Sequence, residues 1–435
     1  MKKYLTFNLI FLLGITIFAQ NSKNDKLKST VNSMADQIEN KVIEWRRDFH
    51  QNPELSNREF KTSEKITRIL KEMGLEVQNG IAHTGVVGIL KGGKPGQVVG
   101  LRADMDALPV QERTPIPFAS KAKGSYNNAE VSVMHACGHD THMAMLLGAA
   151  EILSGIRKDI KGTVKFIFQP AEEGAPLGEE GGAELMVKEG VLENPVVDAI
   201  FGIHISASSE VGTIEYRPEG ILASANSFSI KVIGRQAHGS APWTGIDPIV
   251  TSAQIINSLQ TIISRYSQLT KQPAVVTIGS IHGGVRNNII PEEVEMVGTI
   301  RALDNEMRDK IFERIKLIAT KVAESQGATA EVTINRGIPI TYNNPELTAK
   351  MLPSLQEAAG KENVKLINAI TGAEDFSFYQ EQVPGLFFFV GGMPKGKDPN
   401  ALGAQHHTPD FYVEESGLKL GVKALTYLTI DFLNQ

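Results

Sequence analysis

The stretch VKFIFQPAEEG, residues 164–174, indicates the fold because a mostly apolar strand leads directly into a turn that carries two adjacent carboxylates. Two further runs rich in β-branched residues, at 98–108 and 199–205, also predict strands. Helical patterns lie between these runs, at about 142–156 and 183–189. Strands that alternate with helices are typical of an α/β fold with a mixed, mostly parallel sheet and flanking helices. We therefore expect the functional groups beyond the carboxyl ends of the strands.

A second pattern begins at about Gly220 and predicts a separate domain. Its elements follow the order β-α-β-β-α-β, which is that of a ferredoxin-like α+β unit. The elements are strands at 227–234, 274–284, 292–303 and 328–337, with helices at about 248–266 and 306–326. We therefore place an inserted domain at residues 220–337, between a first part of the main domain at 21–219 and a second part at 338–435.

Residues 1–20 have the pattern of a secretory signal peptide, because two lysines precede an apolar run from Leu5 to Phe18. A spanning helix needs about 20 apolar residues, so this run, which Asn8 interrupts, is short for a membrane anchor. An uncleaved anchor is the alternative. We expect an exported protein, periplasmic or secreted, without stable membrane association once the signal is removed.

The composition excludes several classes of protein. The chain has 435 residues, enough for roughly two or three domains, and its charged fraction of 21% is near the globular average. Lys and Arg number 44 against 49 Asp and Glu, which gives a net charge of −5, so we expect no nucleic-acid partner. Cys137 is the only cysteine, and this excludes an intramolecular disulfide.

Four short polar segments carry side chains that bind transition metals. MHACGHDTHMA, residues 134–144, contains one thiol and three imidazoles, which are ligands for a borderline-soft ion. The other three segments contain Glu172 with Glu173, His204, and His406 with His407. Taken one at a time, these residues also fit a buried thiol, a solvated acidic turn or a core histidine. Together they offer more donors than one zinc ion takes, which indicates two ions that share a bridging ligand.

These segments and several others resemble the amidohydrolase branch of the aminoacylase and carboxypeptidase dimetal metallohydrolases. That branch includes hippurate hydrolases, N-acyl-L-amino acid amidohydrolases and auxin-conjugate hydrolases. The matching motifs occur in order over almost all of the chain after the signal: RADMDALPVQE (102–112), MHACGHDTHMA (134–144), QPAEEG (169–174), GIH (202–204), GRQAHGSAPW (234–243), NNIIPE (287–292), GAEDFSF (372–378) and HHTPDF (406–411). The resemblance implies a dimetal exopeptidase-like catalytic domain and an inserted lid domain that forms a homodimer.

The resemblance also implies the ligands and the base of the metal site. Glu172, the first carboxylate of its pair, would be the general base. His406 stands where the family usually has an apolar residue, and the spacing to the Pro and Phe of the same motif favours His407 as the ligand. The implied metal ligands are Cys137, His139, Glu173, His204 and His407.

Four other polar residues belong to the same motifs. Relatives outside this branch have a metal-binding His where this chain has Asp104, so ligation through Asp104 is left open. Asp106 is interpreted as a residue that orients a ligand. Asp140 and His142 are interpreted as loop and helix-start residues.

In the inserted domain the resemblance implies substrate contacts. His238 would reach an active site across the dimer and polarise the scissile carbonyl. Asn288 and Arg301 would hold the free carboxylate of the substrate, a task that suits a bidentate guanidinium. Glu374 matches its motif, but no role follows from the sequence.

We therefore predict a metal-dependent amidohydrolase that cleaves N-acetyl, benzoyl or similar N-acyl amino acids with a metal-activated water and a glutamate base. A dipeptidase or carboxypeptidase of the same family, acting on short peptides, is the alternative. Two other classes are a hydrolase with Cys137 as nucleophile and a metal-scavenging protein, for which a proton-handling Glu172 would be superfluous. The expected cofactors are two divalent ions per chain, of Zn, Mn, Co or Ni.

Overall fold

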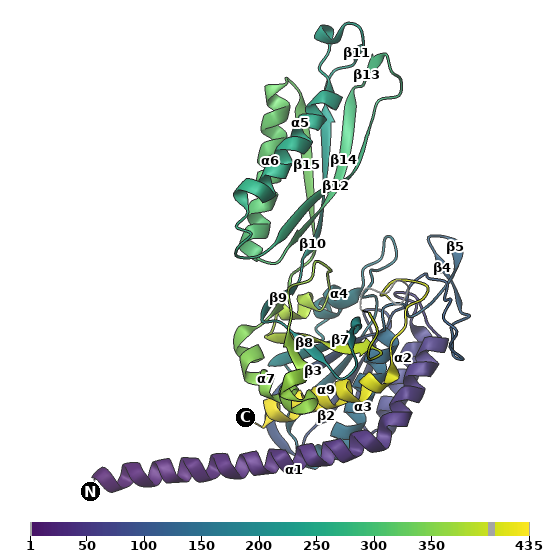
Figure 1. The fold of residues 1–435 in the computed structure, drawn as a ribbon. Helices are drawn as coiled ribbons and strands as arrows, with labels where there is room; N and C mark the ends of the chain where they lie inside the picture. Colours follow the sequence, from purple (N-terminus) through teal and green to yellow (C-terminus); the bar gives the residue numbers. More distant parts are fainter. Residues whose placement is uncertain (1, 399–404, 435) are drawn as a thin grey trace. The chain divides into compact units, whose positions relative to one another are not determined.

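The chain forms two compact units, which a computed structural model describes over residues 2–398 and 405–434 (Figure 1). The first unit comprises the described residues up to Pro218, Asn343–Ile367 and those from Phe378 onward. The second unit comprises Glu219–Tyr342 and Asn368–Ser377. Within the part of the chain that the structure describes, no helix is both long enough and apolar enough to span a bilayer.

The first unit is built on an eight-stranded sheet, and this confirms the predicted α/β class. The four central strands β6, β3, β7 and β18 run parallel to one another, and antiparallel strands flank them. In spatial order the strands are β1 (Glu76–Ile81), β2 (Gly85–Lys91), β6 (Lys161–Gln169), β3 (Lys94–Asp104), β7 (Ala199–Glu210), β18 (Gly385–Met393), β8 (Ile214–Tyr216) and β17 (Val364–Leu366).

Five helices share one apolar core with these strands. They are α1 (Lys2–Gln51), α2 (Phe60–Glu72), α3 (His139–Gly155), α7 (Pro345–Ala359) and α9 (Leu418–Leu433). Helices α1, α3 and α9 pack side by side (Figure 1). Helix α1 ends at Gln51 and α2 begins at Phe60, and Pro53 between them disfavours a helical conformation at Asn52.

The remaining elements of the first unit are short. The structure adds a hairpin that the sequence patterns did not predict, and this hairpin lies just before the 134–144 motif. The elements are β4 (Lys123–Tyr126), β5 (Ala129–Ser132) and α4 (Gly182–Lys188), and α8 (Ser377–Gln380) begins at the boundary between the units.

The second unit has an antiparallel sheet in the order β12-β14-β10-β15, which is the ferredoxin-like arrangement. Its helices α5 and α6 pack on the sheet around a separate apolar core. The elements in chain order are β10 (Ala225–Ile233), β11 (Ala237–His238), α5 (Pro248–Thr261), β12 (Ala274–Gly283), β13 (Ile289–Ile290), β14 (Glu293–Ala302), α6 (Asn305–Ser325) and β15 (Thr329–Ile338). Two further short strands, β9 (Glu219–Leu222) and β16 (Thr341–Asn343), lie at its ends.

The boundaries of the second unit differ from the predicted ones. The prediction ended the inserted domain at residue 337 and assigned everything after it to the main domain, whereas Asn368–Ser377 joins the second unit. The cause is backbone pairing: Ile370 forms a parallel bridge with Leu222, and the N–H of Ala223 donates to the carbonyl of Gly372 at 2.9 Å. Such long-range pairing leaves no local pattern in the sequence.

Candidate metal centre

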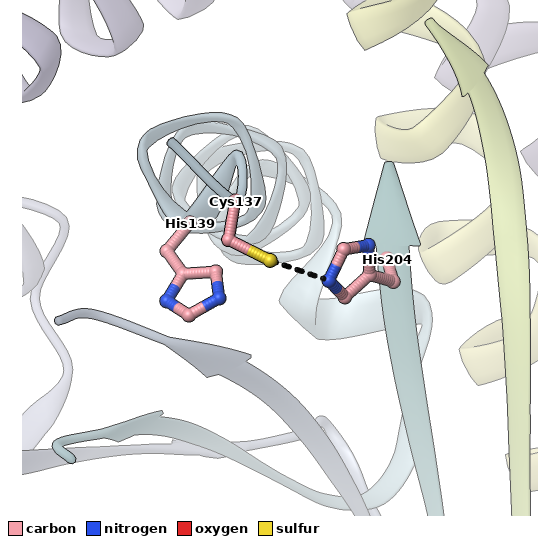
Figure 2. A group of neighbouring side chains, drawn as sticks. All are labelled: Cys137, His139 and His204. Atoms are coloured by element: carbon pink, nitrogen blue, oxygen red, sulfur yellow. Dashed lines mark hydrogen bonds between the residues drawn. The ribbon is translucent and has the colours of Figure 1, made fainter. Parts of the chain in front are cut away.

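The structure brings the five predicted ligands together in the first unit. The Sγ atom of Cys137 is 3.5 Å from Nε2 of His204 (Figure 2) and 3.3 Å from Nε2 of His407. Oε1 of Glu173 is 3.1 Å from Nε2 of His407. The donor atoms of Cys137, His139 and His204 all lie within 4.8 Å of one another.

The cluster lies where two neighbouring strands separate. β3 pairs with β7 only as far as Arg102 and Gly202. The sequence pattern placed this strand at 199–205, but β7 continues to Glu210 because β18 stays paired with it. His204 therefore lies inside a strand, just past the point at which β3 and β7 part, where its side chain can reach the start of α3.

Gly138 allows Cys137 and His139 to meet at the start of α3. Its φ of +98° lies in the left-handed region, which is costly for residues with a Cβ atom. A Cβ atom at this position would lie 2.3 Å from Cγ2 of Ile205, so a side chain is excluded by contact as well. The glycine of this motif is thus required by the close approach of α3 and β7.

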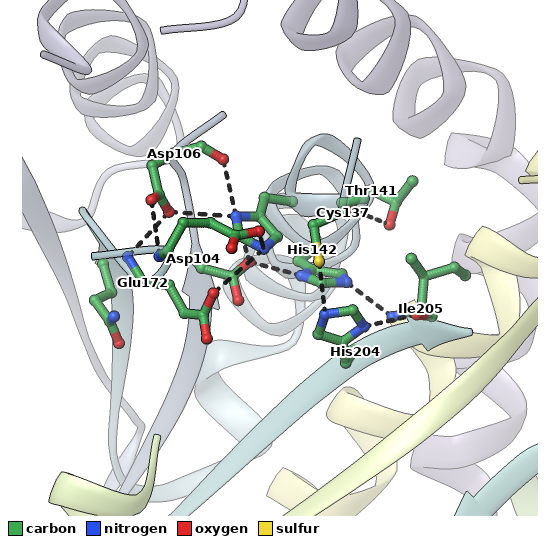
Figure 3. A network of polar contacts seen from close by, with 12 residues as sticks. Asp104, Asp106, Cys137, Thr141, His142, Glu172, His204 and Ile205 are labelled. Carbon is green, nitrogen blue, oxygen red and sulfur yellow. Dashed lines mark hydrogen bonds and ion pairs between the residues drawn. The ribbon is translucent and has the colours of Figure 1, made fainter. Parts of the chain in front are cut away.

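Asp106 holds the turn that carries the two glutamates (Figure 3). Its carboxylate accepts the backbone N–H of Glu172 at 3.1 Å and that of Glu173 at 3.0 Å. The hydroxyl of Ser56 donates to the same carboxylate at 2.8 Å. Asp106 is buried, so these hydrogen bonds fix the direction in which both glutamate side chains leave the backbone.

The orientation of His139 is also fixed by Asp106. Nδ1 of His139 donates to the backbone carbonyl of Asp106 at 2.8 Å. Nε2 then lies 3.8 Å from Oε2 of Glu172 and 3.9 Å from Oε1 of Glu173. This nitrogen is buried and has no hydrogen-bond partner among the described residues. A buried imidazole nitrogen that lies beside carboxylates and has no hydrogen-bond partner in the described part of the chain suits a metal ligand, so the donors present fit a divalent ion.

Asp104 and His142 form a hydrogen bond with each other instead. The N–H of Ile205 donates to Nε2 of His142 at 2.8 Å, so Nδ1 carries the proton and donates to Asp104 at 2.6 Å (Figure 3). The guanidinium of Arg102 donates to the other oxygen of Asp104 at 2.7 Å. Both ring nitrogens of His142 are therefore occupied, and Asp104 is saturated by buried partners.

The hydrogen-bond partners of the ring nitrogens also distinguish His406 from His407. Nε2 of His406 accepts the N–H of Ala207 at 3.1 Å, and Nδ1 donates to the carbonyl of Cys137 at 3.1 Å. His406 thus uses both nitrogens to connect its loop to β7 and to the Cys137 backbone. His407 adopts a φ of +61° and directs Nε2 at the thiol and at Glu173. Of the two, the geometry favours His407 as the ligand.

The charges around the donors favour a cation. Burial raises the pKa of the Cys137 thiol well above its usual value, and the carboxylates of Glu173 and Glu172 raise it further. Burial lowers the pKa of His204, which therefore stays a neutral imidazole. Burial opposes protonation of His139, yet the nearby carboxylates raise its pKa to about 10. A divalent cation would offset the carboxylates and replace the protons on the thiol and on His139.

The residues predicted to contact substrate lie in the second unit. His238 and Asn288 are adjacent, because the N–H of Gly239 donates to the carbonyl of Asn288 at 2.9 Å and β11 pairs with β13. Both side chains are exposed. Arg301 is not beside them: it lies near the far end of β14 and donates to the hydroxyl of Thr299 at 2.5 Å.

Glu374 also belongs to the second unit. It is buried, and its Oε1 atom accepts the N–H of Phe376 at 2.9 Å. This hydrogen bond is local to the loop that carries Glu374.

Sequence reasoning missed Glu59. This buried carboxyl group accepts the N–H of Ala171 at 2.9 Å and the hydroxyl of Thr84 at 2.6 Å. Ala171 has a φ of +53° and comes directly before the glutamate pair. An acidic residue just before a helix is ordinary in sequence, so only the tertiary contact reveals its connection to the site.

A thiol, three imidazoles and two carboxylates at the opening of a mixed α/β sheet define a metal-dependent hydrolase of amide bonds. The chain belongs to peptidase family M20/M25/M40, whose model matches residues 100–431. This confirms the predicted family and the predicted enzyme class, a metallo-amidohydrolase.

Relatives and solved structures agree with that membership. The chain is 42% identical to thermostable carboxypeptidase 2 of Saccharolobus solfataricus over 416 residues, which are 94% of this chain and 99% of that protein. It is 38% identical to an N-acetylcysteine deacetylase of Bacillus subtilis over 404 residues, 92% of this chain and 99% of that protein. A dinuclear metal binding M20 peptidase structure from Bacillus subtilis matches at 35% identity with a TM-score of 0.76, covering 92% of this chain and 99% of that one. The last similarity and the donor clusters support two divalent ions.

Proposed function

We propose that the protein hydrolyses N-acyl amino acids to a carboxylic acid and a free amino acid. The observation that carries this proposal is the adjacent pair on the turn fixed by Asp106. Glu173 faces the ligand cluster, while Oε2 of Glu172 lies 3.8 Å from Nε2 of His139. A protein that only stores metal needs no second carboxylate able to move a proton. The deacetylase name of one relative supports the same class of substrate.

The residues that would hold two ions of Zn, Mn, Co or Ni are Cys137, His139, Glu173, His204 and His407. When bound, such ions polarise the amide carbonyl and lower the pKa of a water molecule. The thiolate and the imidazoles suit borderline-soft ions better than Mg²⁺ or Ca²⁺.

The remaining steps belong to side chains of this protein. Glu172 accepts the proton of the attacking water and returns it to the amide nitrogen as that bond breaks. The N–H of Ser240 donates to Nδ1 of His238 at 3.1 Å, so the neutral ring carries its proton on Nε2. That exposed N–H is suited to donate to the oxygen of the scissile carbonyl. Asn288 and Arg301 would bind the carboxylate of the amino acid.

A homodimer through the second unit is part of this proposal. Arg301 stands eight residues further along β14 than Glu293, a distance of about 26 Å at the rise of a β-strand. His238 lies on β11, which pairs with β13, and β13 ends before Glu293 at the other end of β14. One N-acyl amino acid is too short to touch both side chains of one chain. If both act on the same substrate, His238 and Arg301 must come from different copies.

We also propose that the protein is exported. The support is the pattern at the start of the sequence, where two lysines precede the apolar run from Leu5 to Phe18. Mass spectrometry of the intact protein from the periplasmic and extracellular fractions tests this. A chain that keeps residues 1–20 and stays in the cytoplasm would contradict the proposal.

A carboxypeptidase acting on peptides is the second candidate, and the name of the relative at 42% identity favours it. The deciding experiment measures metal content by mass spectrometry on dialysed protein. It also measures the release of free amino acid from N-acetyl, N-benzoyl and dipeptide substrates, before and after chelation. We expect about two ions per chain and chelator-sensitive hydrolysis of the N-acyl substrates. Hydrolysis of dipeptides alone would favour the second candidate, and full activity without metal would contradict both.

A further inference from the structure

A cavity of about 690 Å³ opens beside the metal centre, entirely within the first unit. Glu173 lines one side of it, so a molecule in the cavity lies next to the proposed ligands. Its other walls come from the segment before α2, the end of β3, the loop after the glutamate pair and the tip of the β4–β5 hairpin. The apolar residues among them include Leu55, Leu108, Pro109, Tyr126, Pro176 and Leu177.

The floor of this cavity is rigid and apolar. Leu55 and Ala107 form a parallel backbone bridge, and the N–H of Ala107 donates to the carbonyl of Glu54 at 2.8 Å. Their side chains pack with Val133 in a small buried cluster. The same cluster attaches the base of the hairpin to the body of the unit, because Val133 directly follows β5.

The hairpin directs Tyr126 over that floor. A Cβ atom on Gly124 would lie 3.0 Å from Leu55 and 3.1 Å from Val133, so this face of β4 is turned toward the cluster. Side chains two residues apart in a strand share a face, and Tyr126 is therefore on the same side as Gly124. The turn after it, Asn127 and Asn128, has positive φ at both residues, which fits a tight two-residue hairpin loop.

The charges of the cavity select an uncharged group. Arg58 is the one cation among its lining residues, all of which lie in the described part of the chain. Its guanidinium is bound by both carboxylate oxygens of Glu179, at 2.5 and 3.1 Å. The charge of Arg58 is thus already paired with Glu179, so a free carboxylate would find no unpaired cation on these walls, whereas an acyl chain or an aromatic ring needs none.

The size of the cavity points to a bulky group. A cavity of roughly 150 Å³ holds benzene, so about 690 Å³ greatly exceeds what an acetyl group fills. Leu177 is 97% exposed and Tyr126 is 46% exposed. Single exposed apolar side chains are common, but these two line the same cavity and would be covered by an apolar ligand.

We propose that this cavity binds the acyl group of the substrate, as an uncharged aryl or extended alkyl group, with Tyr126 and Leu177 as specificity-determining residues. The inference rests on the proposed function, since it assigns the acyl side of an N-acyl amino acid. It places the amino acid, with its free carboxylate, outside this cavity.

The test compares kcat/KM for the N-benzoyl and N-acetyl derivatives of one amino acid. Tyr126→Ala and Leu177→Ala should each lower the benzoyl-to-acetyl ratio by about 10-fold or more, because each removes apolar contact with the larger group only. Tyr126→Phe should keep the ratio of the wild type, since the ring makes the contact. Matched controls are Glu130→Ala, which lies on the other face of the hairpin, and Leu366→Ala, an exposed leucine on β17. Metal content is measured for every variant.

The possible outcomes distinguish a failure of this inference from a failure of the proposed function. If the wild type hydrolyses N-acyl amino acids and neither Tyr126→Ala nor Leu177→Ala changes the ratio, the acyl cavity is wrong and the proposed function stands. If the metal-loaded wild type cleaves dipeptides but no N-acyl amino acid, the proposed function fails and the acyl assignment fails with it. A ratio that falls equally in Glu130→Ala also contradicts the inference, because that variant leaves the cavity intact.

Discussion

The Oε1 atom of Glu59 accepts the backbone N–H of Ala171 at 2.9 Å, and this hydrogen bond holds a residue whose φ is +53°. A left-handed conformation costs a non-glycine residue about 1–2 kcal/mol, so the turn needs such a contact to persist. Burial, with the charge of Asp106 nearby, raises the pKa of Glu59 to about 8. Glu59 is thus a positioning residue for the glutamate pair, and it keeps its proton at neutral pH.

Glu59→Ala should therefore lower kcat by about 10–100-fold with little change in KM, as is typical when the support of a ligand is lost. Glu59→Gln should restore most of the activity, because the amide oxygen can accept the N–H of Ala171 and the amide nitrogen can donate to Thr84. Steady-state kinetics at neutral pH on both variants decide this. Equal losses in the two variants would show that the hydrogen bond to Ala171 is not what matters.

Glu172→Gln should reduce kcat by about 100-fold or more while the protein keeps its metal and its melting temperature, because only the proton acceptor is removed. Glu180→Gln is the matched control, since Glu180 lies on the surface and pairs with Lys188. Kinetics and metal analysis are measured together. A variant that retains more than a few per cent of activity would exclude Glu172 as the base.

His407→Asn and His406→Asn should differ in metal stoichiometry. Removing Nε2 of His407 deletes a metal ligand, and we expect the metal content to fall from about two ions per chain to about one. Removing His406 deletes two backbone hydrogen bonds, so affinity should drop by about 10–100-fold with two ions still bound at saturating metal. Titration followed by mass spectrometry distinguishes these results, and the reverse pattern would assign the ligand to His406.

Removing the metal should both abolish activity and expose Cys137 to alkylation. A thiol engaged by an ion is protected, so iodoacetamide should modify Cys137 slowly in loaded protein and faster after chelation. Activity should disappear on chelation and return with added metal. A Cys137 nucleophile predicts the opposite result, in which chelation is harmless and alkylation of loaded protein is fatal.

His50 should make stability depend on pH. Burial alone would lower the pKa of His50, but the carboxylates of Asp140 and Glu112 raise it. The two ring nitrogens of His50 lie 2.9 Å from Asp140 and 3.1 Å from Glu112. A histidine whose pKa is raised by folding stabilises the protein fully below its unfolded pKa of about 6.5 and loses that contribution as pH rises through its folded pKa.

His50→Gln should therefore lower the melting temperature more at pH 6 than at pH 9. At pH 6 the cost should be about 3 kcal/mol, since the variant removes a buried cation that faces two buried carboxylates and leaves Asp140 with Arg46 alone. Thermal unfolding at both pH values measures the difference. Equal losses at the two pH values would mean that His50 is neutral in the folded protein.

The sequence predicted much of the architecture because local periodicity reports local structure. The strand at 274–284 and the helix at 306–326 appear at nearly those residues, as β12 and α6. The metal-binding segments could also be predicted from the sequence, since Cys and His are the usual ligands of transition metals. What the sequence could not provide are properties of the folded chain: the motif spacing favoured His407, but only the structure shows that backbone groups engage both ring nitrogens of His406.

Three features lay beyond local pattern. The β4–β5 hairpin depends on Gly124 fitting against Leu55, and the transfer of Asn368–Ser377 to the second unit depends on pairing with Leu222. The role of Glu59 depends on a contact with Ala171, 112 residues away. Each is a long-range event, so no window of neighbouring residues contains it.

The separation of the donors along the chain also orders events in time. Cys137 and His407 are 270 residues apart, and the second unit is made between them. A ribosome releases residues in sequence, so the full set of donors cannot exist until residue 407 has emerged. A nascent chain therefore carries the glutamate pair without a complete site beside it from residue 173 until residue 407 has emerged. Hydrolytic activity that needs all of these donors therefore cannot begin before His407 has left the ribosome.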